Sequence, residues 1–178
     1  MSKAPRRLSV SLDEESAEKL ESLKKEMDCS KARVIREALK HLYAVEEFGS
    51  SLEAVETYLD FLAKDEHVIV DVDHWNSLFE EIGEGSEEFW EEVEDIGEQH
   101  WDEYYDKGLR TVSDILEYVE KTNWYRLNRN SEKDFTLVIK VEKSKKFVKK
   151  FLESLFRASP HEVRIFEGRR KLRLNVVS

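Results

Sequence analysis

The side chains that could perform catalysis are few and match no known catalytic pattern. The chain has five histidines and a single cysteine, Cys29. It contains no G-x-x-x-x-G-K phosphate loop, no G-x-G-x-x-G, no H-E-x-x-H and no nucleophile elbow. Adjacent acids such as Glu87-Glu88 and Glu91-Glu92 lie in charged runs that need not be buried, which gives carboxylate catalysis little support. We therefore predict that the protein is not an enzyme and uses no cofactor.

Large aromatic side chains gather between residues 86 and 107, together with one histidine. Their helical spacing predicts a broad apolar face that includes Trp90, His100, Trp101 and Tyr104. Rings at this density are typical of a core, but they can also line a pocket for an apolar or planar ligand. The core is the favoured interpretation, and a ligand pocket at these four residues is the alternative. A metal or haem site built on the histidines ranks far below both, so no metal is predicted.

Charged residues divide the chain into three zones within a net charge of −10. Residues 1–48 carry 10 basic and 10 acidic side chains, residues 49–108 carry 2 and 20, and residues 109–178 carry 17 and 9. The acidic middle zone is therefore expected to face away from any phosphate-bearing partner. No apolar run approaches the length of a membrane span, and the start lacks the apolar core of a signal peptide. We expect a cytoplasmic protein with no membrane partner.

The first 48 residues, here called the head, predict one strand and two helices. Residues 7–12 alternate polar and apolar side chains, which is the period of a strand with one buried face. Asp13 fits a helix N-cap, and Ser30 fits the cap of a second helix after a break at Asp28 and Cys29. A lone strand leaves its backbone donors and acceptors unpaired, so this strand needs a partner.

These features together resemble the ribbon-helix-helix repressor family of the Arc, MetJ and CopG type. The resemblance covers residues 6–44 and rests on a basic residue that opens an alternating strand, on the helix start at residues 13–15, and on the turn at residues 27–32. It implies that the strands of two chains pair antiparallel and enter the DNA major groove. The family often has glycine where this chain has Asp28.

The same resemblance implies which residues contact DNA. In the family, outward strand side chains read base edges, and here the matching positions are Arg7, Ser9 and Ser11. Arginine can bond both acceptors of a guanine, and a short hydroxyl can donate or accept. The family also anchors a phosphate at the N-terminus of the second helix. The expected phosphate contacts are Ser30, Lys31, Arg6 and Lys3.

Residues 49–64 predict a linker helix, capped by Ser50 or Ser51. Its apolar residues follow heptad spacing and fit either a short dimer coiled coil or packing on the chain's own second domain: Phe48, Leu52, Val55, Leu59 and Leu62.

Residues 65–178 predict a second domain that mixes helices and strands. Residues 67–72 are rich in β-branched side chains and predict a strand, with Asp73 as the cap of the next helix. Further helices are expected at 86–107, 112–121 and 147–156, and strands at 135–141, 163–166 and 172–177. The expected fold class is α+β and mainly helical, with a ribbon-helix-helix head, a linker helix and a C-terminal α+β domain that has a small antiparallel sheet.

Together these observations predict a homodimeric, sequence-specific DNA-binding transcription regulator, with repressor as the first interpretation. The expected partners are double-stranded DNA with a palindromic or repeated operator, a second copy of the chain in a dimer or higher oligomer, and a small-molecule effector of the C-terminal domain. An antitoxin and a DNA-partitioning or structural DNA-binding protein are the alternatives. Antitoxin tails tend to be short and disordered until bound, whereas this one is long and patterned.

Overall fold

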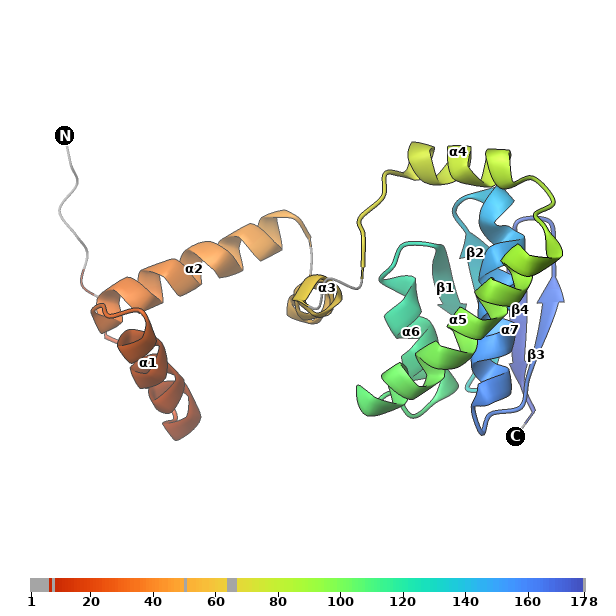
Figure 1. Cartoon of the computed structure of the whole chain (residues 1–178). Coiled ribbons are helices and arrows are strands. Elements are labelled where there is room, and N and C mark those ends of the chain that lie inside the picture. The colour runs from red at the N-terminus through yellow and green to blue at the C-terminus, as the bar shows by residue number, and fades with distance from the viewer. Residues whose placement is uncertain (1–6, 8, 50, 64–66, 178) are drawn as a thin grey trace. The chain divides into compact units, whose positions relative to one another are not determined.

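The computed structural model describes residue 7 and residues 9–49, 51–63 and 67–177 (Figure 1). The chain divides into two compact units, Met1–Glu56 and Thr57–Ser178. The described residues form a mainly helical α+β structure, which confirms the expected class. The helices are α1 (Glu14–Glu26), α2 (Lys31–Glu47), α3 (Leu52–Ala63), α4 (Val72–Ile82), α5 (Glu87–Asp106), α6 (Val112–Glu120), the short 3-10 helix η1 (Glu142–Ser144) and α7 (Lys145–Ala158). The strands are β1 (Tyr125–Arg129), β2 (Asp134–Ile139), β3 (Val163–Glu167) and β4 (Lys171–Val176).

Both helices of the head begin at the caps that the sequence predicts. The Oδ1 of Asp13 accepts a hydrogen bond from the Ser16 N–H at 2.8 Å. The Oγ of Ser30 accepts one from the Arg33 N–H at 3.3 Å. Each cap satisfies a backbone donor that the first helical turn leaves without a partner.

A Schellman turn joins α1 to α2. Asp28 has a φ of 44°, in the left-handed region, and its N–H donates to the Lys25 carbonyl at 3.3 Å. The Cys29 N–H donates to the Lys24 carbonyl at 3.2 Å, which completes the motif. Aspartate therefore occupies a backbone conformation that glycine adopts without strain.

Among its described residues, the segment before α1 carries no strand in the single chain. Arg7 and residues 9–13 have no regular secondary structure. Val10 and Leu12, which the alternation assigns to a buried face, are 64% and 46% exposed. A strand is defined by hydrogen bonds to a neighbour, and a single chain gives this segment none.

α3 spans the boundary between the two units, and its C-terminal half belongs to the second. Ser51 caps it, as predicted, because its Oγ accepts from the Ala54 N–H at 3.1 Å. Phe61 is buried against Tyr118, with ring centroids 5.1 Å apart. Most of the predicted heptad side chains are exposed: Phe48, Leu52, Leu59 and Leu62.

The prediction of a strand at residues 67–72 is wrong. Residues 67–71 form neither helix nor strand, and α4 begins at Val72. Asp71 caps this helix in place of Asp73, since its Oδ1 accepts from the Asp73 N–H at 2.8 Å. The β-branched run pairs with no strand of the sheet, so Val68 and Ile69 are 85% and 77% exposed.

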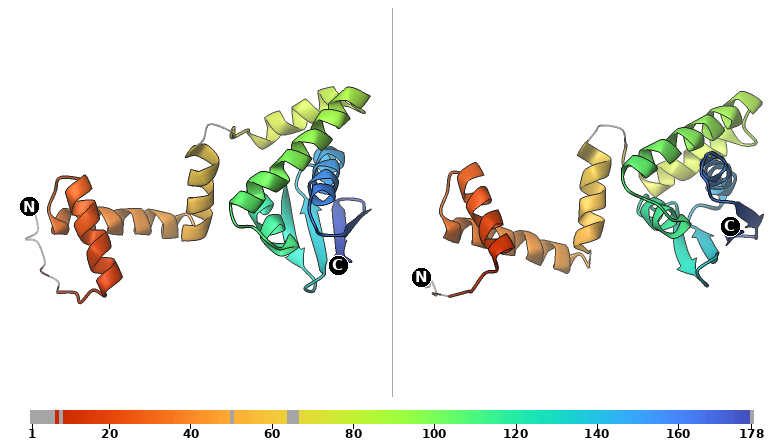
Figure 2. Two further views of the ribbon diagram at one scale, coloured as in Figure 1. Left: turned by 60° about the horizontal axis from the view of Figure 1, so that its bottom comes forward. Right: turned by 90° about the horizontal axis from the view of Figure 1, so that it is seen from below.

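The second unit is built on a four-stranded antiparallel sheet with the order β1-β2-β4-β3. Strands β2, β3 and β4 and helices α5, α6 and α7 confirm the sequence prediction, whereas β1 was not predicted. The helices α5, α6 and α7 lie on one side of the sheet (Figure 2). The fully buried core is formed by residues of α6, α7 and the inward positions of the strands, including Ile115, Leu116, Tyr125, Phe135, Leu137, Leu152, Leu155, Leu172 and Leu174. None of the described helices has the length and apolar character that a membrane crossing needs.

Candidate functional site

The predicted base-reading side chains lie on the segment that precedes α1. Arg7, Ser9 and Ser11 are all exposed, as contact with a base edge requires. They alternate with Val10 and Leu12, so pairing of this segment with another strand would place the polar and apolar sets on opposite faces. Lys3 and Arg6, the predicted outer phosphate contacts, lie outside the described residues.

The predicted phosphate anchor lies at the start of α2. Ser30 caps the helix and leaves its first turn accessible, because Ser30 and Lys31 are both exposed. The first turn of α2 contains no acidic residue, which suits an anion at the positive end of the helix dipole. The Lys31 ammonium forms an ion pair with Glu21 of α1. The hydrogen bond that Lys31 donates in this pair holds the pKa of the Glu21 carboxyl below its ordinary value.

The head buries few of its apolar side chains within one chain. α1 has no buried residue, and α2 has one, Val34. The exposed large apolar side chains of the described part of the head are Val10, Leu12, Leu23, Met27, Ile35, Leu39, Leu42, Tyr43 and Phe48. Burial of apolar surface is the main stabilising contribution to folding, so this surface needs a cover that one chain does not supply.

Comparison with known families agrees with this geometry. Residues 6–46 match the family described as ribbon-helix-helix protein, copG family. This match confirms the resemblance of the head to the ribbon-helix-helix family. The comparisons with curated proteins and with solved structures find no match.

Outside the ribbon-helix-helix head, the structure places the four predicted pocket residues along α5. Trp90 and Tyr104 are 8% and 3% exposed and belong to the core, as the favoured interpretation expects. The His100 ring packs edge-on against Phe151 at 5.2 Å, and Trp101 packs on His161 at 6.0 Å. Burial raises the pKa of the Tyr104 hydroxyl. None of the four lines the cavity described next, and their role at a pocket stays a prediction.

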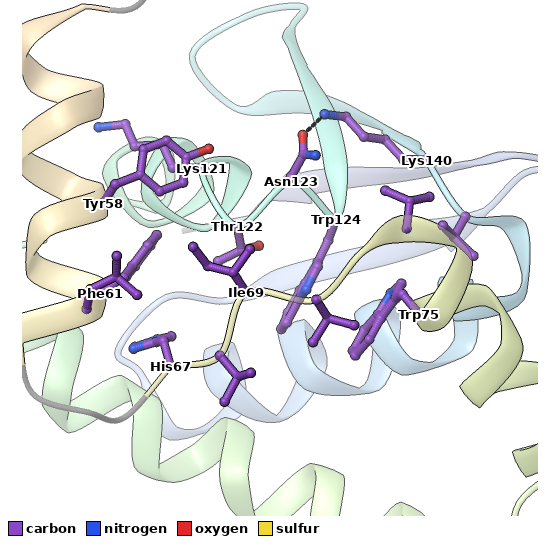
Figure 3. Close-up of a pocket in the computed structure, with 15 residues that line it drawn as sticks. Tyr58, Phe61, His67, Ile69, Trp75, Lys121, Thr122, Asn123, Trp124 and Lys140 are labelled. Carbon is purple, nitrogen blue, oxygen red and sulfur yellow. Dashed lines mark hydrogen bonds between the residues drawn. The ribbon is translucent and has the colours of Figure 1, made fainter.

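A different set of residues lines a cavity of about 330 Å³ in the second unit (Figure 3). Its walls come from the C-terminal half of α3, the irregular segment before α4, the start of α4 and the chain around β1 and β2. Phe61 and His67 lie on one side and Trp124 and Trp75 on the other, with Ile69 between them in this view. The two indole rings are parallel within 9°, with centroids 6.3 Å apart. The cavity can therefore hold an apolar body.

Polar groups occur at a few points of the cavity wall. Lys140 donates to the Oδ1 of Asn123, and Lys121 donates to the Thr57 hydroxyl at 3.1 Å. Among the described residues that line the cavity, two are lysines and none is acidic, although the chain as a whole is acidic. This composition favours a ligand with an apolar body and a negative end.

Two nitrogen atoms beside the cavity have no hydrogen-bond partner within the described part of the chain. The Nδ1 of His67 and the Nε1 of Trp75 are buried without a hydrogen bond to any described residue. An indole N–H can only donate, and leaving it unpaired costs about 1–3 kcal/mol. The sequence contained a signal for this region, the β-branched run at residues 67–72. Its interpretation as a strand concealed that these side chains line a cavity.

Proposed function

We propose that this protein is a homodimeric, sequence-specific transcription regulator that acts as a repressor in the cytoplasm and has no catalytic activity. Its operator would be read by a two-stranded β-ribbon, one strand from each chain, in the major groove. The observation that carries the proposal is the family match over residues 6–46. It is supported by a head that, in a single chain, gives its described ribbon residues no partner strand and leaves most of its large apolar side chains exposed.

Base reading is tested by electrophoretic mobility shift with the operator and a scrambled duplex. Arg7→Ala should cost about 1–3 kcal/mol on the operator and relax the base preference. Lys31→Ala should weaken binding to both duplexes alike, because a phosphate contact carries no sequence information. Equal operator affinity of the wild type and an Arg7, Ser9 and Ser11 triple alanine variant would contradict reading by this segment.

Dimerisation is tested with two substitutions on opposite faces of the same segment. Val10→Asp would place a charge in the shared apolar core and should produce monomers with an unfolded head. Ser9→Asp adds the same charge on the polar face and should leave the dimer intact while reducing DNA binding. Sedimentation at several micromolar concentrations measures the oligomeric state of both variants, and the mobility shift measures their DNA binding. A folded monomeric head in the wild type would rule out the obligate dimer.

We further propose that Thr57–Ser178 is an effector domain whose ligand occupies the cavity of Figure 3. This unit has its own core within one chain, which favours a sensing domain over the disordered tail of an antitoxin. A ligand changes DNA affinity only if it binds the competent and incompetent forms of the protein differently, and typical coupling is about 1–3 kcal/mol.

Octanoate and 1-octanol are suitable probes, because they share an apolar chain and differ in charge. All four tryptophans lie in this unit, so their fluorescence reports binding. Octanoate should bind more tightly than octanol, and Ile69→Phe should weaken both by filling the cavity. Leu78→Phe, an exposed residue of α4 that does not line the cavity, is the control. If Ile69→Phe and the control bind the probes equally well, the cavity is not the site.

A further inference from the structure

The side of the C-terminal sheet that faces away from α6 and α7 carries a set of basic and polar side chains. Inward positions of the strands belong to the core, so the intervening positions point the other way. We call this outward set the open sheet face; it comprises Arg126, Asn128, Asp134, Thr136, Val138, Arg164, Phe166, Lys171, Arg173 and Asn175. Within the described residues of this unit, the helices α5, α6 and α7 lie on the opposite side (Figure 2).

The strand register brings these side chains into rows. Arg126, Val138 and Lys171 are neighbours across β1, β2 and β4. The next row joins four residues across all four strands: Asn128, Thr136, Arg173 and Phe166. Adjacent strands lie about 4.8 Å apart, so the cations are spread about 10 Å across the sheet rather than gathered at one point.

The ion pairs of this unit separate its cations into two groups. On the helical side, five of the six basic residues of η1 and α7 are paired with carboxylates, and Lys146 donates to the Glu84 carbonyl oxygen: Lys143 with Glu80, Lys145 and Lys149 with Glu167, Lys150 with Glu94, and Arg157 with Glu94 and Glu98. On the open sheet face, Arg126 and Lys171 form no ion pair with any described residue. Arg173 pairs with Asp134, the one acidic member of this face, and Arg164 pairs with Glu162, which directly precedes β3. The face therefore keeps the positive charges of Arg126 and Lys171, which no carboxylate of the described residues pairs with.

We propose that the open sheet face binds the phosphate backbone of duplex DNA beside the operator, as a second contact independent of base sequence. Arginine and lysine together with asparagine and threonine side chains are the groups that bind phosphate and sugar oxygens in protein–DNA complexes. A sheet face without a row of aromatic rings suits a backbone contact better than base stacking, because Phe166 is its single aromatic member. The acids of α5 lie on the other side of the sheet and do not oppose this contact.

The inference goes beyond the proposed function of the head, since it assigns DNA contact to a unit that the family match does not cover. Once the head has bound the operator, the DNA beside it is present at a high effective concentration for a second contact on the same chain. Even a contact that is weak by itself then raises the overall affinity for DNA. A DNA contact here also explains why arginine and lysine lie on one sheet face of a protein whose net charge is −10.

The test compares two double variants of the full chain that make the same change in net charge. Arg126→Gln/Lys171→Gln removes two cations from the open sheet face. Lys143→Gln/Arg157→Gln removes two half-exposed cations from the helical side. Affinity for a 40-base-pair duplex that contains the operator, and for a scrambled duplex, is measured between 50 and 300 mM salt.

The sheet variant should bind both duplexes about tenfold more weakly than the control variant. Its slope of log affinity against log salt should be shallower by about 1.8, since each lost phosphate contact contributes about 0.9. Equal affinity and slope of the two variants would overturn the proposal. Tighter binding of single-stranded DNA or RNA through this face would also overturn the proposal. Loss of self-association in the sheet variant would overturn it too, because it would identify an acidic surface of a second copy as the occupant of this face.

The outcome separates this inference from the proposal for the head. If the ribbon variants lose base preference and the sheet variant behaves as the control, the head is the DNA-binding site and the sheet face is not. If the sheet variant loses affinity while the ribbon triple variant does not, the sheet contact stands and ribbon reading fails.

Discussion

Gly97 of α5 lies directly against Ser154 of α7. A Cβ added to Gly97 would lie 2.0 Å from the Ser154 Oγ and 2.7 Å from the Phe151 carbonyl oxygen, both closer than real Cβ contacts. Glycine therefore allows α5 and α7 to approach so closely that Trp90 and Val93 of α5 reach the core. Glycine inside a helix normally reduces stability, so here the close packing must offset that cost.

Gly97→Ala should destabilise the second unit by about 1–3 kcal/mol, because the helices must separate to admit the methyl group. Ser154→Gly in the same chain should recover part of the loss by removing the nearest atom. Denaturant unfolding followed by tryptophan fluorescence reports on this unit alone, since it holds every tryptophan. Gln99→Ala, at an exposed position of α5, serves as the control and should change stability by less than about 0.5 kcal/mol. No difference between the two alanine variants would show that the helices are not in close contact.

Asp28→Gly should stabilise the head by about 0.5–1 kcal/mol. The residue has a φ of 44°, which glycine adopts without steric cost, although glycine also gains entropy in the unfolded chain. Asp28→Ala should destabilise the head, because alanine has neither the backbone freedom of glycine nor a polar side chain. The head contains no tryptophan, so its unfolding is followed at a fixed protein concentration as the loss of far-UV circular dichroism that no change in tryptophan fluorescence accompanies. Stabilisation by alanine would contradict the left-handed turn.

The parts of the fold that follow from local physical rules could be predicted from the sequence. Ser30 and Ser51 cap their helices because a short hydroxyl before an apolar periodic run satisfies backbone donors. α5 and α7 follow from apolar side chains at helical spacing. β2 follows from its alternation of buried and outward residues.

The parts that depend on tertiary pairing could not be predicted. The run at residues 67–71 has strong β propensity but finds no neighbouring strand, and tertiary context decides such cases. β1 does not follow from the sequence because three of its five residues, Arg126, Asn128 and Arg129, are polar and break the alternation, whereas Tyr125 is fully buried by the fold. The open sheet face depends on the register of four strands. Its cations are far apart in the sequence, so the sequence alone does not show that they share one face.

Acid should destabilise the contact between α5 and α7. Hydrogen bonds from Lys150 and then Arg157 hold the pKa of Glu94 below its ordinary value of 4.5. A carboxylate with a lowered pKa contributes stability above its unfolded value, and this contribution is lost as the pH falls through its folded value. Glu94→Gln should therefore flatten the decline in stability of the second unit below about pH 4.5. Glu91→Gln, an exposed change on the same helix, is the control; identical acid profiles of the two variants would exclude this role.

Glu21→Gln should increase the affinity of the protein for any DNA duplex by releasing Lys31. In the free protein the Lys31 ammonium pairs with Glu21, so it must exchange that carboxylate for a phosphate when DNA binds. We expect a gain of a few fold at low salt, equal for operator and scrambled duplex, because the contact carries no base information. The pair is exposed and its loss should cost the head little stability.

Glu18→Gln makes the same charge change on α1 at a residue that forms no ion pair among the described residues, and it should give a smaller gain in affinity. In a Lys31→Ala background, Glu21→Gln and Glu18→Gln should give equal gains in affinity; if Glu21→Gln still gives the larger gain there, it does not arise from release of this lysine.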